Sequence, residues 1–156
     1  MGRSRTAKRG VVVAVLALGA LALAGCASNP DLTGLESDLG QVDGVNGAFV
    51  WPTHSGAPWN TQVQVMLFLD DSSDDAVVEA VRGSAAVIAA DAEASRHDVT
   101  ISFVDGDRAD YADRSDASAA EISVMPPVYE ALGLPEGSVY AITLRPEDVR
   151  AIAGGE

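Results

Sequence analysis

The 156-residue sequence contains a single cysteine, Cys26, a single lysine, Lys8, and two histidines, His54 and His97. One cysteine excludes a disulfide within the chain, and two histidines beside it do not supply the ligands of an ordinary zinc site. General base catalysis most often uses histidine, and neither histidine occurs in a motif with a nucleophile. We therefore expect no resident metal, no cofactor and no enzymatic activity, and a small hydrolase with scattered catalytic residues is the alternative.

Basic residues are also scarce. Ten Lys and Arg residues stand against 23 Asp and Glu, which gives a formal net charge of -13. An acidic surface repels phosphates, so we expect no nucleic-acid partner. Anionic lipid head groups would repel it too, so membrane attachment should not depend on a basic patch. The acidity is typical of a soluble surface, and an acidic face for cations or for a basic partner is the alternative.

The N-terminus has a different composition from the rest. Residues 3–9 hold four basic residues, residues 11–23 are apolar and uncharged, and Ala24 and Gly25 are small. This succession is typical of a secretory signal, which predicts a signal peptide over residues 1–25. The apolar run of residues 11–25 is shorter than the roughly 20 residues of a membrane-spanning helix, so a retained anchor is the weaker interpretation.

The four residues Leu23-Ala24-Gly25-Cys26 resemble the lipobox of bacterial lipoproteins. The resemblance implies a diacylglycerol on the sulfur of Cys26, cleavage before it and acylation of the new amino group, because two or more acyl chains hold a protein stably at a membrane. It places the mature chain on the extracytoplasmic face of the cell membrane. Cleavage would leave 6 basic and 23 acidic residues, a net charge of -17. The composition, nearly free of lysine, is similar to that of proteins from high-GC actinobacterial genomes.

Residues 26–31 form a short tether, and residues 32–156 are long enough for one domain. Hydrophobic periodicity and turn residues predict its elements. The pattern favours an α+β, two-layer sandwich, with a mixed or antiparallel sheet of about four strands and helices on one face, ferredoxin-like or related. The expected elements are helix 32–42, strands 45–51 and 61–69, helix 74–95 capped by Ser72 or Ser73, strand 98–105, a helical region 117–132 broken at Pro126-Pro127, strand 139–144 and a helix from Pro146.

Two segments share a pattern of residues. Residues 39–49 and 132–142 both contain Leu-Gly, then an acidic residue followed by Gly, then Ala and a large apolar residue at the same spacing. The pattern indicates either an internal duplication or the turn chemistry that commonly follows a helix.

Carboxylates are concentrated between residues 105 and 116, which makes calcium a more plausible metal than zinc. Asp105, Asp107 and Asp116 fit positions 1, 3 and 12 of an EF-hand loop, but Asp110 occupies the glycine position and the bidentate Glu is absent. We therefore expect a solvated acidic loop, with a calcium-dependent adhesion module as a second alternative.

Both tryptophans flank one loop. Trp51, His54 and Trp59 lie within nine residues of a chain that is poor in aromatics. Paired tryptophans on a loop can stack on sugars or enter a membrane interface. They more often pin a hairpin loop to the core, since tryptophans are usually largely buried. If the domain is a binding module, this loop is the first candidate for its contact surface. We expect Trp51 to be the more buried and Trp59 the more exposed. The sequence thus suggests a membrane-anchored module that binds a protein or another envelope component through this loop.

Overall fold

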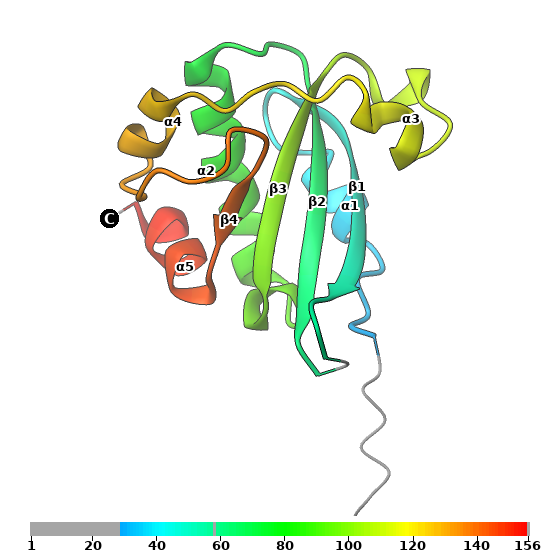
Figure 1. The fold of residues 1–156 in the computed structure, drawn as a ribbon, viewed down its shortest axis with the longest axis vertical. Coiled ribbons are helices and arrows are strands. Elements are labelled where there is room, and N and C mark those ends of the chain that lie inside the picture. The colour runs from blue at the N-terminus through cyan, green and yellow to red at the C-terminus, as the bar shows by residue number, and fades with distance from the viewer. Residues whose placement is uncertain (1–28, 58, 156) are drawn as a thin grey trace, which may run out of the picture.

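The computed structural model describes residues 29–57 and 59–155. The predicted signal and Cys26 lie outside the described residues. Four strands form a single sheet in the order β1-β2-β3-β4, and the longer helices cover one of its faces (Figure 1). This confirms the two-layer α+β sandwich expected from the sequence. The strands are β1 (Val45–His54), β2 (Thr61–Leu69), β3 (Asp98–Asp105) and β4 (Ile142–Leu144).

The sheet is mixed. β1 and β2 form an antiparallel hairpin, β2 and β3 are parallel, and β4 is antiparallel to β3. A helix connects the two parallel strands, as parallel neighbours require. Because a hairpin comes first, the element order differs from the βαββαβ order of ferredoxin-like domains, and the fold is a related sandwich.

Seven helical segments surround the sheet in the described part of the chain. α1, α2, α4 and α5 lie on the face that holds the main core, whereas η2 and α3 lie on the other side (Figure 1). No helix among the described residues is long and apolar enough to cross a bilayer. The α-helices are α1 (Leu35–Leu39), α2 (Asp74–Ala90), α3 (Arg114–Ser118), α4 (Pro126–Ala131) and α5 (Pro146–Gly154), and the 3-10 helices are η1 (Ala94–Arg96) and η2 (Arg108–Asp110).

The main core lies between the sheet and these helices. Side chains alternate between the two faces of a strand, so every second residue of β2 points toward α2. Val63, Val65, Leu67 and Leu69 are all buried there. Burying a side chain of this size contributes about 1.5–3 kcal/mol, so this alternation accounts for much of the stability.

Side chains of the acidic runs cap the helices that follow them. Ser73 is the N-cap of α2, and its hydroxyl accepts a hydrogen bond from the Ala76 N–H. Asp107 and Asp113 cap η2 and α3 in the same way. Carboxylates at these positions satisfy backbone donors and complement the helix dipole.

The two segments of similar sequence differ in backbone conformation. Gly40 has a φ of -67°, whereas Gly133, at the equivalent position, has a φ of +69°. Gly44 has a φ of +79°, and Gly137 is not in the left-handed region. Each segment does lead from a helix into an edge strand, but the turns between them are built differently.

Candidate binding groove on the open face of the sheet

The face of the sheet opposite the main core changes character along its length. Toward the end where β2 and β3 finish, it is apolar: Met66, Phe68 and Val104 form a second buried cluster. Toward the other end the same face carries Gln64 of β2 and Thr100 of β3. Residues 108–118, which carry η2 and α3, form a cover over the apolar part of this face only. Ala117 of α3 belongs to the second cluster.

The cover is held over the sheet by Arg108. Its guanidinium lies 3.6 Å from the centroid of the Phe49 ring and donates to the carbonyl oxygen of Tyr111. Its backbone N–H donates to Oδ1 of Asn46, which ties the cover to the start of β1. Beneath it, a Cβ on Gly47 would stand 2.6 Å from the Cβ of Arg108. Glycine at position 47 is therefore what allows the cover to approach the sheet this closely.

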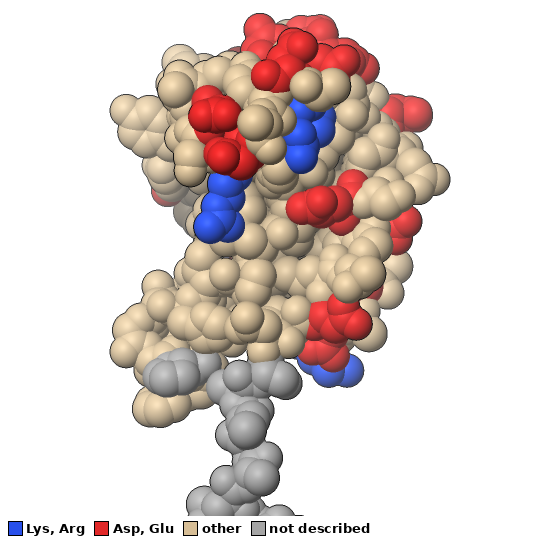
Figure 2. Space-filling view, turned by 90° about the vertical axis from the view of Figure 1, so that its right-hand side faces the viewer, with Lys and Arg blue, Asp and Glu red and all other residues tan. Residues whose placement is uncertain are grey.

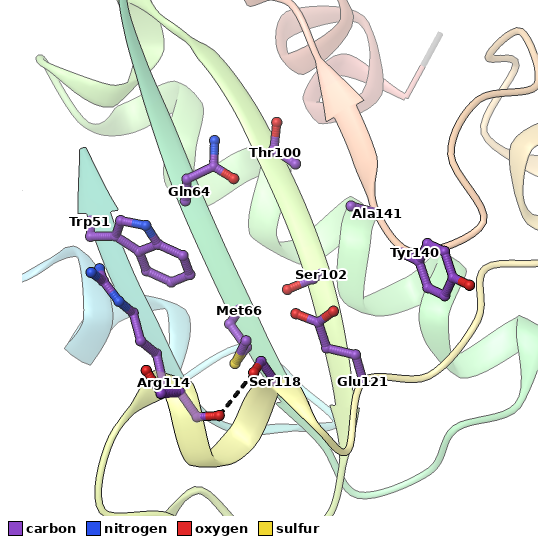
Figure 3. Close-up of a pocket in the computed structure, with 11 residues that line it drawn as sticks. Trp51, Gln64, Met66, Thr100, Ser102, Arg114, Ser118, Glu121, Tyr140 and Ala141 are labelled. Carbon is purple, nitrogen blue, oxygen red and sulfur yellow. Dashed lines mark hydrogen bonds between the residues drawn. The ribbon is translucent and has the colours of Figure 1, made fainter. Parts of the chain in front are cut away.

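A groove of about 320 Å³ lies where the cover ends. One wall is Trp51 of β1, whose ring has the Arg114 guanidinium 4.6 Å from its centroid. The opposite wall is Tyr140, which precedes β4 and is 62% exposed. Figure 3 shows these side chains on either side of a floor formed by β2 and β3. The floor residues are Gln64, Met66, Thr100 and Ser102.

The groove has one cationic and one anionic side chain among its described lining residues. Arg114 stands on the Trp51 side, and the carboxylate of Glu121 points over the floor near Ser102 (Figure 3). The floor adds hydroxyl and amide groups that both donate and accept hydrogen bonds. Such a lining suits a polar ligand with flat or apolar faces, since half-exposed aromatic rings flank hydrogen-bonding groups.

The same lining lacks the usual elements of hydrolytic catalysis. Neither His54 nor His97 is among the described residues that line the groove, so Ser102 and Ser118 have no histidine beside them to act as a general base. The Ser118 hydroxyl donates instead to the Ser115 carbonyl oxygen at 2.8 Å.

The three residues of the predicted tryptophan loop occupy different places. β1 continues to His54, so Trp51 lies within a strand and contributes to the groove. His54 is exposed and follows Trp51 by three residues in the same strand. Side chains alternate between the two faces of a strand, so His54 points to the opposite face from Trp51. Trp59 lies in the β1–β2 loop and is 83% exposed, while Trp51 is half-buried, which confirms the predicted order of their burial. The structure does not bring the three side chains together.

Sequence reasoning missed the other half of the groove. Arg114, Glu121 and Tyr140 come from segments that show no binding pattern. They meet Trp51 only because the cover crosses β1, β2 and β3 and the chain then returns along β4. The concentration of aromatics could identify Trp51 alone.

The carboxylates of the acidic loop make hydrogen bonds to different groups of the chain. Asp107 accepts from the Ala109 N–H, Asp113 accepts from two backbone N–H groups, and Asp105 accepts from the Ser72 hydroxyl. These carboxylates are thus directed at separate donors. Among the described residues, no three His, Cys, Asp or Glu side chains are grouped so that they could hold a metal ion.

Comparisons of the chain with protein families, with curated proteins and with solved structures found no match.

Proposed function

We propose that the chain is the precursor of a non-enzymatic cell-envelope lipoprotein, anchored through lipid on Cys26, whose mature domain binds a polar envelope component in the groove between Trp51 and Tyr140. The anchor rests on the lipobox-like residues 23–26 at the end of an apolar run. The binding role rests on the groove. Its two aromatic walls use two of the eight aromatic residues in the chain, and the floor between them is polar.

The lining favours a ligand without strong net charge. Arg114 and Glu121 offset one another, and the floor contributes only neutral groups. Sugar rings and extended peptides present both apolar faces and hydrogen-bonding groups, which an aromatic wall and a polar floor recognise together. Both occur in the envelope, so soluble cell-wall fragments that contain a disaccharide and a peptide are the appropriate probe.

Titrating such fragments into the isotopically labelled domain tests the binding role by NMR. We expect saturable shifts of the Gln64, Thr100 and Ser102 amides and of the Trp51 indole. Tyr140→Ala should weaken binding about tenfold or more, as truncation of an aromatic anchor does.

Val139→Ala is the matched control. Val139 is the neighbour of Tyr140 and is 52% exposed, but it does not line the groove. It should leave binding unchanged. Absence of saturable shifts, or equal effects of the two substitutions, would contradict the groove as the binding site.

A further inference from the structure

We propose that the tip of the β1–β2 hairpin, with Trp59 at its end, lies in the head-group region of the membrane that holds the lipid on Cys26, and that this contact fixes the orientation of the domain. The inference rests on the proposed lipidation. It adds a second membrane contact, made by the folded domain.

The chain enters the domain from the hairpin end. The Glu36 carboxylate at the start of α1 accepts a hydrogen bond from the Val50 N–H, and Gly40 after α1 lies beside Gly47. α1 therefore runs antiparallel to β1, and the residues before it extend toward the end of β1 where the hairpin turns (Figure 1). Cys26 is three residues before Asn29, so at most about 11 Å of extended chain separates them.

The tip presents Trp59 outward, beside hydrogen bonds that join Ser55 and Asn60 across the base of the turn. The side-chain amide of Asn60 donates to the Ser55 carbonyl oxygen at 2.9 Å, and the Ser55 N–H donates to the Asn60 carbonyl oxygen at 3.1 Å. Gly56, with a φ of +77°, makes the turn. The Trp59 side chain is 83% exposed, the highest value among the large hydrophobic residues that the structure describes as exposed. Tryptophan concentrates at membrane–water interfaces because its ring is apolar and its N–H is polar.

The hairpin has His54 as its one ionisable side chain. Residues 45–69 contain no Asp, Glu, Lys or Arg, in a chain with 33 such residues. A tip without carboxylates enters an anionic head-group region without the repulsion that the rest of this acidic chain would meet.

The acidic runs lie at the opposite end of the domain. Residues 70–75 follow the end of β2 and residues 105–116 follow the end of β3, and these strands are parallel, so both runs leave the sheet at the end remote from the hairpin. Figure 2 shows acidic side chains gathered over that end, whereas fewer charged side chains, of both signs, lie toward the hairpin end on this face. Several charges of the elements at the hairpin end are paired, Arg96 with Glu93 and Arg145 with Glu147 and Asp148. The negative charge of the domain is thus concentrated away from the hairpin, which favours an orientation with the hairpin toward the membrane.

A lipid surface fits Trp59 better than a sugar or a protein partner does. Trp59 does not line the groove, where Trp51, Tyr140 and the polar floor lie. An anchor residue of a protein interface is surrounded by contacts that exclude water. Trp59 projects alone from the end next to the tether, which is the placement that a membrane contact requires.

Fluorescence quenching in vesicles tests the proposal, because the chain has only two tryptophans. The lipidated chain is reconstituted in phosphatidylethanolamine–phosphatidylglycerol vesicles with brominated acyl chains. Trp51→Phe leaves Trp59 as the only tryptophan, and Trp59→Phe leaves Trp51 as the matched control. We expect a blue shift and a loss of emission for Trp59, and neither for Trp51.

Flotation of the same vesicles distinguishes failure of the lipid anchor from failure of the Trp59 contact. If the chain does not float with the vesicles, the lipid anchor fails, and the inference fails with it. If the chain floats but Trp59 is quenched no more than Trp51, the anchor stands and the inference is overturned. Shielding of Trp59 from a soluble quencher without quenching by brominated lipid would also overturn it, because the occupant would then not be lipid.

Discussion

Trp51 packs against the second apolar cluster beneath Arg114, whereas Trp59 contributes little buried surface. Trp51→Ala should therefore lower the free energy of unfolding by about 2 kcal/mol, below the roughly 3–5 kcal/mol of a fully buried aromatic residue. Trp59→Ala should change it by no more than about 0.5 kcal/mol. Urea unfolding of the mature domain measures both, and a larger loss for Trp59→Ala would show that the loop supports the fold.

Ser84 is the one buried polar side chain whose hydroxyl has no hydrogen-bond partner among the described residues. It lies in α2 on the face that packs against the sheet. Because an unsatisfied buried hydroxyl is costly and alanine is the better helix former, Ser84→Ala should raise the free energy of unfolding by about 1 kcal/mol.

Ser118→Ala is the control for Ser84→Ala, since the Ser118 hydroxyl donates to the Ser115 carbonyl oxygen. It should give no gain in stability. A loss of stability for Ser84→Ala in thermal unfolding would indicate that the Ser84 hydroxyl makes a bond that stabilises α2.

At the scale of elements, α5 begins with an interaction that depends on pH. The Asp148 carboxylate accepts from the backbone N–H of Arg145 at 3.0 Å and from its guanidinium. Burial acts to raise the pKa of Asp148, but the hydrogen bonds and charge of Arg145 outweigh it, so that the pKa lies below the ordinary value of 3.8. The folded state thus favours the ionised carboxylate, and its contribution is present above that ordinary value and is lost as pH falls through the lowered one.

Asp148→Ala should therefore lower the free energy of unfolding at neutral pH by about 1 kcal/mol, as loss of a cap does. The difference from the wild type should shrink as the pH falls below 3.8. Chemical unfolding over a pH series checks both statements, with Arg145→Ala completing a double-mutant cycle. A difference that stays constant into strongly acidic conditions would exclude the carboxylate as its source.

Element boundaries were predictable where one pattern dominated the local sequence. The spans 61–69 and 98–105 agree with β2 and β3 to the residue, because a buried apolar residue at every second position marks the core face of each strand, although the end of β2 is buried on both faces. β1 was expected to end at Trp51 because Pro52 marks a loop. It continues to His54, since β1 is an edge strand and an edge tolerates a residue without an N–H.

Helix ends depended on side-chain bonds that hydrophobic spacing does not reveal. The expected helix 74–95 ends at Ala90, where the Asp91 carboxylate accepts from the N–H groups of Glu93 and Ala94 and starts η1. Aspartate competes with the helical backbone in this way. The expected helix 32–42 shortens to α1 between Gly34, which has a φ of +94°, and Gly40. The groove was harder still to predict from the sequence, because Trp51, Arg114 and Tyr140 meet only through long-range packing.

At the scale of the whole molecule, the proposed binding groove and the proposed membrane contact lie on different sides of the domain. The groove opens on one face of the sheet, away from the main core. The hairpin and the entry of the chain lie at one end, and the acidic runs lie at the other (Figures 1 and 2). With the hairpin on a membrane, the groove faces sideways and the acidic end points outward, so an envelope component could reach the groove without displacing the domain from the lipid.

Intact-mass analysis of the membrane-extracted protein measures whether Cys26 carries lipid. We expect a chain that begins at Cys26 and carries the mass of a diacylglyceryl group, with or without a third acyl chain. Cys26→Ala should abolish metabolic labelling with a fatty-acid analogue and leave residues 1–25 attached or the protein soluble. A mature chain that begins elsewhere, or a Cys26→Ala variant that is still labelled and retained in the membrane, would contradict the account.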